Sequence, residues 1–220
     1  MLESMLAGKQ VDKNVLIDID FSRQDIGDTF MTDLAGNQWD LVGNDPDCKV
    51  VSDSVKGKAF RFKGTTYFRS PLVSRLLLAN VSFSLELGIH SDASASGVIL
   101  GTGNYPSSGG ILGGFNLSTG QYPATYIQMF MTNSSGVYQR CLPANTAWAN
   151  TWDDIIFTRR RNTSVFGQVT RNGVITGTNS VGDNPFGNGK DYFCIGANAH
   201  ILGTSGFKGL ISRIKLKLLT

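Results

Sequence analysis

The stretch ISRIKLKLLT, residues 211–220, contains a run in which apolar residues alternate with cations. The cations are Arg213, Lys215 and Lys217. A period of two is typical of a β-strand that has one face buried and the other in water. The segment VLIDIDF, residues 15–21, alternates in the same way, but its outward face carries Asp18 and Asp20. Opposite charges on facing antiparallel strands stabilise the pair by about 0.2–1 kcal/mol each. The sequence therefore predicts that the first and last strands are antiparallel neighbours, with an anion-binding surface as the alternative use of the basic row.

The composition favours an all-β fold. The 220 residues include 26 glycines and many Ser, Thr and Asn, but only two glutamates, Glu3 and Glu86. Good helix formers are scarce and turn formers are common. We find no linker and no repeat of fixed period, so we expect a single sandwich domain over residues 15–220, preceded by an N-terminal arm over residues 1–14.

Charge, cysteine content and hydropathy exclude several classes of protein. A net charge of +3 with 17% charged residues does not suggest a nucleic-acid binder. The N-terminus lacks a basic start followed by an apolar run, and no segment has the length of a membrane helix. We therefore expect no signal peptide and no membrane insertion. Cys48, Cys141 and Cys194 are odd in number and widely spaced, which favours free thiols in a reducing cytosol.

Short alternating segments separated by Gly, Asn and Ser follow the first strand. The predicted strands are 37–43, 58–64, 67–71, 81–90, 97–103, 110–118, 124–132, 136–143, 152–160, 164–172, 191–198 and 207–219. Asn172-Gly173 predicts a two-residue hairpin turn, because both residues tolerate positive φ. Many short strands at such intervals are typical of a sandwich or barrel. We interpret Arg159, Arg160 and Arg161 as a solvated turn at a hairpin tip.

Four passages resemble, in the same order, the concanavalin A-like lectin/glucanase jelly rolls of the laminin-G type. They are GKAFRFKGTTYFRSP (57–71), FSRQDIGDTFMTDLAGNQWDLVG (21–43), WDDIIFTRRRNTSVFGQVTRNGVITG (152–177) and FCIGANAHILGTSGFKGLISRIKL (193–216). The resemblance spans roughly residues 16 to 218. It implies a two-sheet antiparallel jelly-roll sandwich with adjacent first and last strands, and core positions for Trp39 and Trp152.

Modules of this family occur in glycan-binding proteins, in hydrolases and in bacteriophage virion proteins. A chain with no signal, a short arm and unpaired cysteines is most similar to the virion group. We therefore expect a non-catalytic recognition or assembly module, a virion accessory protein for capsid decoration or tail attachment. Its partners would be virion proteins or further copies of itself, and it would be assembled in the host cytoplasm. The alternatives are a lectin-like domain for a cell-surface glycan and a glycoside hydrolase.

The sequence offers no catalytic constellation that we recognise. Glycosidases of this fold place carboxylates at E-x-D-x-x-E along one strand. The most similar stretch here, SLELGIHSD, has Glu86 but no acidic residue two positions later. Asp18 and Asp20 have the right spacing but belong to the outward face of the first strand. His90 and His200 lie near no nucleophile motif. We expect the protein not to be an enzyme.

Candidate ligand contacts are aromatic and amide side chains in loops and at strand ends, the groups that contact sugar C–H faces and hydroxyls. They are Asn104, Tyr105, Tyr122, Tyr126, Asn133, Tyr138, Arg140 and Trp148.

Two segments gather the oxygen ligands that calcium prefers, GNDPD (43–47) and GDNPFGNGKD (182–191). The candidate ligands are Asp45, Asp47, Asp183 and Asp191. The alternative is that these residues simply form turns. Calcium is the one cofactor considered, and otherwise we expect none.

The arm is a candidate anchor. Leu2, Met5 and Leu6 would form a small apolar stripe if residues 1–14 were helical. So short a helix is marginal alone and needs a surface on which to pack. A disordered terminus is the alternative.

Overall fold

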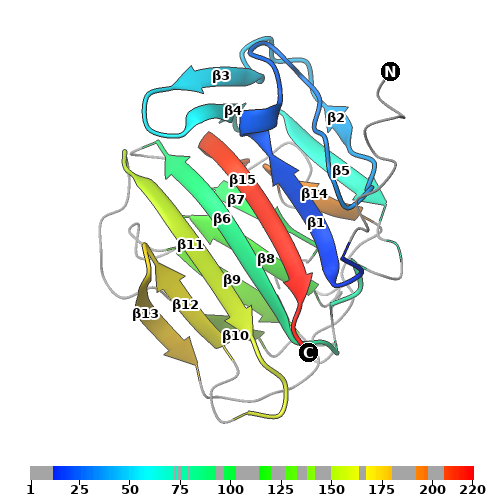
Figure 1. The fold of residues 1–220 in the computed structure, drawn as a ribbon, viewed down its shortest axis with the longest axis vertical. Coiled ribbons are helices and arrows are strands. Elements are labelled where there is room, and N and C mark those ends of the chain that lie inside the picture. Colours follow the sequence, from blue (N-terminus) through cyan, green and yellow to red (C-terminus); the bar gives the residue numbers. More distant parts are fainter. Residues whose placement is uncertain are drawn as a thin grey trace.

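The computed structural model describes residues 12–71, 73, 76–78, 80–92, 97–102, 114–119, 127–132, 138–141, 150–163, 167–179, 192–197 and 206–220. These residues form two antiparallel β-sheets packed face to face, with a 3₁₀ helix, η1 (Phe21–Arg23), after the first strand. Figure 1 shows the larger sheet in front and the smaller sheet behind it. The expected fold class, an all-β two-sheet jelly-roll sandwich, is confirmed.

The larger sheet has eight strands and is organised around β15 (Lys208–Leu218). β15 pairs with β6 (Phe83–Ser91) along its length, with β4 (Gly57–Lys63) near its start and with β1 (Val15–Asp20) near its end. Beyond β6 follow three strands, and beyond β4 one. These are β11 (Trp152–Arg159), β12 (Gly167–Arg171) and β13 (Val174–Asn179), and then β3 (Val50–Asp53).

The smaller sheet has seven strands in the order β10, β9, β8, β7, β14, β5, β2. Their bounds are β10 (Tyr138–Cys141), β9 (Ile127–Thr132), β8 (Gly114–Thr119), β7 (Gly97–Gly101), β14 (Tyr192–Ile195), β5 (Tyr67–Pro71) and β2 (Asp40–Val42). Four of these strands, β7 to β10, are consecutive in the chain and neighbours in the sheet, because short connections favour antiparallel neighbours.

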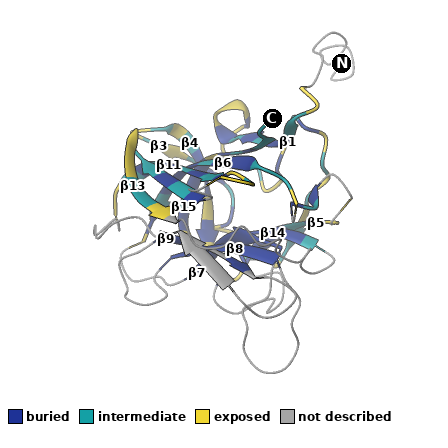
Figure 2. Ribbon diagram, turned by 90° about the horizontal axis from the view of Figure 1, so that it is seen from below, coloured by how far each residue is buried: buried dark blue, intermediate teal, exposed yellow. Residues whose placement is uncertain are grey.

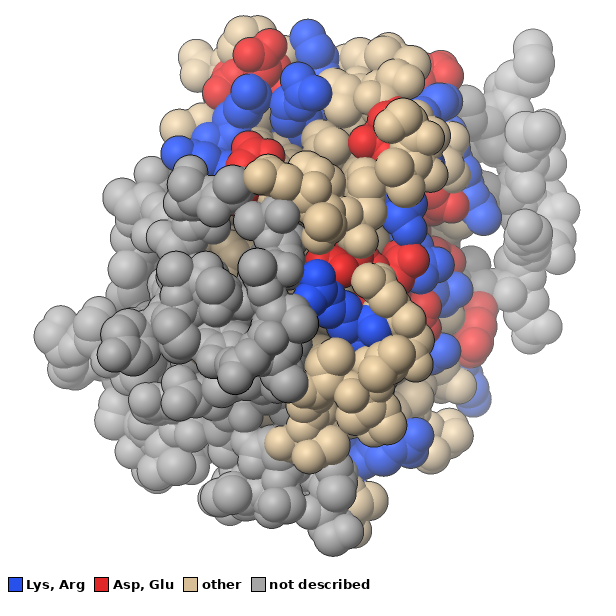
Figure 3. Space-filling view, turned by 90° about the vertical axis from the view of Figure 1, so that its left-hand side faces the viewer, with Lys and Arg blue, Asp and Glu red and all other residues tan. Residues whose placement is uncertain are grey.

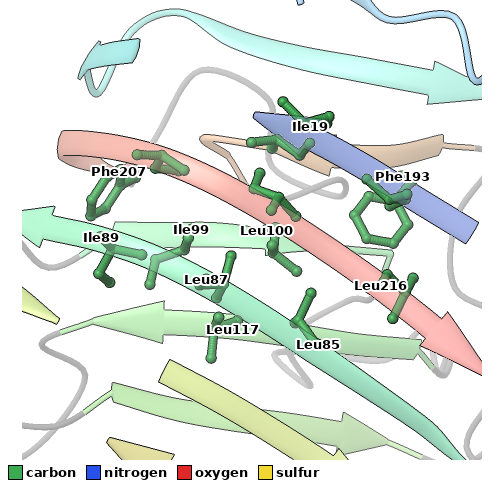
Figure 4. Packing of buried hydrophobic residues seen from close by; sticks show 14 of the residues in the cluster. Ile19, Leu85, Leu87, Ile89, Ile99, Leu100, Leu117, Phe193, Phe207 and Leu216 are labelled. Atoms are coloured by element: carbon green, nitrogen blue, oxygen red, sulfur yellow. The ribbon is translucent and has the colours of Figure 1, made fainter. Parts of the chain in front are cut away.

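The core lies between the two sheets, where alternate residues of each strand point inward. In β6, Phe83, Leu85, Leu87 and Ile89 are fully buried, as the alternation in the sequence predicts. Side chains of β6, β15 and β1 meet those of β7, β8 and β14 (Figure 4), and the buried residues lie between the layers (Figure 2). Burying each such aliphatic or aromatic side chain stabilises the fold by about 1.5–3 kcal/mol.

A β-bulge at Ser212 sets which side chains of β15 face the core. Ile211 pairs with Ile89 and Arg213 pairs with Gly88, so Ser212 is an extra residue. Before the bulge Ile211 points inward, and after it Ile214 and Leu216 do, although Ile211 and Ile214 are three positions apart. An extra residue shifts the alternation by one, and both halves of the strand can then face the same core.

The predicted pairing of the first and last strands is confirmed, and the two strands lie side by side (Figure 1). Asp18 faces Lys215, and their charged groups are 3.6 Å apart. The other charged residues of the two strands have different ion-pair partners from those expected. Asp20 bonds the backbone of η1 and pairs with Arg23 (3.4 Å), while Arg213 pairs with Asp154 (3.6 Å) and Lys217 with Glu86 (3.3 Å). The basic row is therefore neutralised from both sides, by β1 and by β6 and β11.

Two local predictions have different outcomes. Asn172 and Gly173 have φ values of 49° and 81° and join β12 to β13, as the hairpin prediction requires. The short strand β3, by contrast, was not predicted. Its four residues are too few to show alternation, and pairing with β4 alone defines it.

Trp39 and Trp152 have different environments. Trp39 packs against the core, edge-on to Phe193 at 5.8 Å, and its indole N–H donates to Asp33 Oδ2 at 3.0 Å. Trp152 was expected in the core, but this is wrong. In β11 the residues that point inward begin with Asp153, so Trp152 lies on the outer face of the larger sheet and is only half-buried.

The three arginines at the end of β11 are not all solvated, contrary to the sequence-based interpretation. Arg159 is 1% exposed, and its Nη1 donates to the carbonyl oxygens of Leu78 (3.1 Å) and Val81 (2.9 Å). Arg160 is exposed, and Arg161 donates to Asn80 Oδ1 at 3.1 Å. Arg159 thus satisfies carbonyl groups of the irregular segment before β6, which a buried backbone requires.

The assembly stripe Leu2, Met5 and Leu6 lies outside the described residues, so the arm stays a prediction. In the part of the chain that the structure describes, no helix is long and apolar enough to span a membrane.

Replacing Asp18 by Lys tests the pairing of β1 with β15. The substitution places a cation beside Lys215, and both side chains are about one third exposed, so we expect a loss of roughly 0.5–1 kcal/mol in the free energy of unfolding. Urea denaturation at low salt measures it, and 0.5 M salt should reduce the difference. Asp92→Lys, at an exposed position, is the control. Equal losses in the two variants would contradict a specific Asp18–Lys215 interaction.

Replacing Arg159 by Lys tests its structural role. Lysine cannot reproduce the planar guanidinium, and a buried carbonyl would lose its donor, so we expect a loss of about 2 kcal/mol in the free energy of unfolding. The control is Arg160→Lys at the neighbouring exposed position, for which we expect no change beyond about 0.5 kcal/mol. The role assigned to Arg159 is wrong if both variants unfold at the same denaturant concentration.

Candidate functional site

Most of the sequence-predicted contact residues lie outside the described residues. These are Asn104, Tyr105, Tyr122, Tyr126, Asn133 and Trp148, and the calcium candidates Asp183 and Asp191. In the sequence, the six contact residues fall between β7 and β11, so they belong to the connections that follow the strands of the smaller sheet. Tyr138 and Arg140 lie on β10, whose backbone is described.

The register of the smaller sheet brings Arg140 into one row with residues of five other strands. Arg140 is opposite Phe130 of β9, which is opposite Asn116 of β8. The row continues through Gly101 of β7, Cys194 of β14 and Arg69 of β5. Directly opposed residues share one face of a sheet. Because Phe115 and Leu117 of β8 belong to the core, this row lies on the outer face, and we call it the Asn116 row.

Polar side chains of this face are deeply buried. Asn116 is 4% exposed, and Ser118, two residues further along β8, is 1% exposed. Gln128 of β9 is paired with Ser118 and is fully buried. Burial of amide and hydroxyl groups is unfavourable unless they are hydrogen-bonded.

Among the residues that the structure describes, Asn116 Oδ1 and Ser118 Oγ find no hydrogen-bond partner. A buried polar atom without a partner costs about 1–3 kcal/mol, and a ligand that supplies the partner recovers that free energy. The unused atoms are an acceptor and a hydroxyl that can both donate and accept. Such a pair fits a ligand that carries hydroxyl groups.

Gly101 makes room for the Asn116 side chain. A methyl group at position 101 would collide with Asn116 Oδ1 and with the carbonyl oxygen of Phe115. Glycine in a strand interior often marks the close approach of another group, and here that group is the Asn116 amide.

The other end of the row combines a cation with aromatic rings. The Arg69 guanidinium lies 4.8 Å from the centroid of the Tyr192 ring, and its buried Nε has no hydrogen-bond partner among the residues described. Tyr67 and Cys194 form a small buried cluster beside them. Burial raises the pKa of Tyr67, and it raises the pKa of the Cys194 thiol to about 12, despite the opposing effect of Arg69. Cys194 is therefore a neutral thiol and not a nucleophile at neutral pH.

The calcium candidate at residues 43–47 acts as a turn. Asp45 Oδ1 accepts from the Asp47 backbone N–H at 3.0 Å, and Asp45 Oδ2 accepts from the Thr65 hydroxyl at 3.4 Å. Aspartate commonly stabilises a turn in this way. Among the described residues, no three His, Cys, Asp or Glu side chains gather as a metal site.

Sequence reasoning missed Asn116, Ser118, Gln128, Arg69 and Tyr192 as site residues. A signal for three of them was present, because GFNLST and IQMFMT place polar residues between core residues in two consecutive strands. Arg69 and Tyr192 meet only through the pairing of β5 with β14, which are over a hundred residues apart in the chain.

Comparisons with known proteins identify the fold. No protein-family model matches the sequence, and no curated protein matches it. Domain 4 of AbnA, a GH43 extracellular arabinanase from Geobacillus stearothermophilus, has a TM-score of 0.63 and 18% identity over 94% of both chains, and its structure contains arabinotriose. The binding domain of Paraclostridial Mosquitocidal Protein 1 has a TM-score of 0.67 and 12% identity over 94% of this chain and 50% of that one.

The binding domain of Botulinum Neurotoxin DC, solved in complex with SialylT, has a TM-score of 0.60 and 12% identity. The match covers 94% of this chain and 48% of that domain, so the chain spans about half the length of the toxin binding domains. At these identities the likeness shows a shared β-sandwich fold. The laminin-G type and a relation to virion proteins stay predictions from the sequence.

The raised pKa of Cys194 predicts a specific loss of stability at alkaline pH. The folded state keeps the thiol protonated up to a pKa of about 12, whereas an unfolded chain ionises it near its ordinary value of 9.0. The stabilising contribution is therefore complete below pH 9 and is lost as the pH rises towards 12. Between pH 8 and pH 11, the free energy of unfolding should fall more steeply for the wild type than for Cys194→Ala. Parallel curves would contradict the assignment.

Proposed function

We propose that this chain is a non-catalytic carbohydrate-binding β-sandwich module, and that the Asn116 row with Ser118 forms part of its ligand face. The observation that carries the proposal is a pair of buried polar atoms, Asn116 Oδ1 and Ser118 Oγ, that have no partner in the described part of the chain. Natural folds rarely leave such groups unsatisfied, and the exceptions call for a functional explanation.

The chemistry of the face suits a saccharide. Sugar hydroxyls can donate to Asn116 Oδ1 and exchange hydrogen bonds with Ser118 Oγ, while sugar C–H groups pack on aromatic rings. Tyr192 lies on this face beside Arg69, and Tyr138 lies on the edge strand β10. In the sequence, the six predicted contacts between β7 and β11 directly follow strands of this sheet.

The structural neighbours support this choice among the alternatives drawn from the sequence. One neighbour that matches over nearly its whole length was solved with arabinotriose, and another was solved with SialylT. We therefore prefer the lectin-like alternative to the virion accessory protein. The virion hypothesis places the protein in a particle assembled in the host cytoplasm, with virion proteins or further copies of itself as partners. It rests on the resemblance to laminin-G-type jelly rolls and on the N-terminal arm over residues 1–14.

The absence of catalysis is part of the proposal. Glu86, the one glutamate near a glycosidase-like spacing, pairs with Lys217 at 3.3 Å on the outer face of the larger sheet. It thus lies on the opposite sheet from the Asn116 row, and it acts as an ion-pair partner. The neighbours named above are described as binding domains or as domain 4 of an arabinanase.

The double variant Asn116→Ala/Ser118→Ala tests the proposal. Removing groups that have no partner in the protein should change the free energy of unfolding by no more than about 1 kcal/mol, whereas two lost hydrogen bonds to a ligand should weaken binding about tenfold. A glycan array identifies the saccharide, and calorimetry gives Kd for the wild type and the variant. Thr170→Ala, on the outer face of the larger sheet, is the matched control and should bind like the wild type.

Two outcomes would contradict this assignment. If the double variant loses several kcal/mol of stability, the two side chains are structural and have partners within the fold. If it binds the saccharide with unchanged Kd, the ligand face lies elsewhere.

A further inference from the structure

A second cluster of polar and aromatic side chains lies on the opposite side of the sandwich from the Asn116 row. It consists of Trp152 and Asp154 of β11, His90 of β6, Arg213 of β15, and Asp53 and Lys56 of the β3–β4 turn. We call it the Trp152 cluster. Trp152 pairs with His90, and Asp154 pairs with Gly88, which in turn pairs with Arg213. The register of three strands therefore holds the cluster in place.

The Trp152 ring lies beside the carboxylate of Asp53. Asp53 Oδ1 accepts from the backbone N–H of Val55 (2.8 Å) and Lys56 (2.7 Å). Burial acts to raise the pKa of Asp53, but these hydrogen bonds and nearby His90 outweigh it, so the pKa lies below its usual value. Asp53 is therefore ionised at neutral pH, beside an indole that is partly exposed to solvent.

Two polar atoms of the cluster neither donate nor accept a hydrogen bond within the described ranges of the chain. The His90 ring lies 5.6 Å from the Trp152 ring at 57°, and its Nδ1 is buried without a partner. Asp154 Oδ1 is also buried without a hydrogen bond, since Arg213 Nη2 is 3.6 Å away. The other oxygen, Asp154 Oδ2, bonds Lys56 Nζ at 2.9 Å. Within one cluster, then, the Trp152 ring contacts His90 and Lys56, and Lys56 is bonded to Asp154.

The charges of the cluster balance. Asp53 and Asp154 offset Lys56 and Arg213. Figure 3, which faces the left-hand edge of the molecule as seen in Figure 1, shows basic and acidic side chains interspersed over the described part of that edge. A balanced site gives no net attraction to an anion, and binding an anion would disrupt the existing ion pairs. The chemistry thus favours a neutral ligand rich in hydroxyl groups.

Lys56 occupies the place that such a ligand would take. Its Nζ lies 5.9 Å from the centroid of the Trp152 ring, at the outer limit of a cation–π contact, while it bonds Asp154 Oδ2 at 2.9 Å. A ligand can therefore displace Lys56 from the ring without breaking its bond to Asp154. The C–H face of a sugar ring could then pack on the indole, with Lys56 moving to the hydroxyls.

We propose that the Trp152 cluster is a second saccharide-binding site, specific for a neutral sugar residue. The sugar packs on the Trp152 indole, and its hydroxyls bind His90 Nδ1, Asp154 Oδ1 and Lys56 Nζ. The site is independent of the Asn116 row, since the two lie on the outer faces of different sheets, and the module would therefore be bivalent.

NMR titration of the full chain separates the two sites. The probes are arabinotriose, a panel of neutral oligosaccharides, and sialyllactose as the anionic comparison. Indole N–H resonances of Trp152 and Trp39 are assigned with Trp152→Phe and Trp39→Phe. Trp39 is a matched control because its indole also lies beside a carboxylate, that of Asp33. A neutral saccharide should shift the Trp152 resonance, saturably, and leave that of Trp39 unchanged. The Trp152 shift should persist in Asn116→Ala/Ser118→Ala.

Variants within the cluster give the second readout. Trp152→Phe or His90→Leu should weaken binding at this site about tenfold without altering affinity at the Asn116 row. If either variant fails to fold, Asp154→Asn replaces it and should also weaken binding at the Trp152 cluster. An unshifted Trp152 resonance at saturating neutral saccharide overturns the second site, even if the Asn116 row binds. A stronger response to sialyllactose overturns the neutral specificity. Loss of all shifts in Asn116→Ala/Ser118→Ala shows a single site and also overturns the inference.

Discussion

The fold depends on β15 and on the single extra residue within it. β15 is hydrogen-bonded to β6, β4 and β1, so three segments far apart in the chain take their register from it. The bulge at Ser212 lets Ile211 and Ile214 both face the core, and Ser212 Oγ bonds the carbonyl oxygen of Gly88 at 3.3 Å. A side chain at position 88 would collide with that hydroxyl, so Gly88 and Ser212 require each other. The same shift of register turns Arg213 outward towards Asp154.

The two outer faces of the sandwich follow different electrostatic principles. On the larger sheet, cations of β15 alternate with carboxylates from β1, β6 and β11, and partly exposed ion pairs of this kind contribute little stability individually. On the smaller sheet, the polar groups of β8 are buried, and two of them lack partners. The first arrangement is what a solvated sheet needs. The second is unfavourable for the fold alone and directs the functional interpretation to the smaller sheet, as the buried atoms His90 Nδ1 and Asp154 Oδ1 direct it to the Trp152 cluster on the larger one.

The sequence predicted the features that rest on local patterns. Alternation located most strands, opposite charges paired β1 with β15, and Asn172-Gly173 marked a hairpin. It failed where long-range contacts decide the outcome. Arg159 is buried because it reaches the carbonyl groups of Leu78 and Val81, and Trp152 faces outward because Asp153 takes the inward position and pairs with Arg171. The candidate site was only partly predicted, because Arg69 and Tyr192 meet through strand pairing and because most sequence-predicted contacts lie outside the described residues.

The central claim is that the outer face of the smaller sheet binds a saccharide through polar atoms that the fold leaves unused. A crystal structure of the protein with the bound oligosaccharide tests it most directly. The account predicts sugar hydroxyls within about 2.7–3.2 Å of Asn116 Oδ1 or Ser118 Oγ. A structure in which both atoms are hydrogen-bonded within the protein, with the sugar bound away from the smaller sheet, would contradict it.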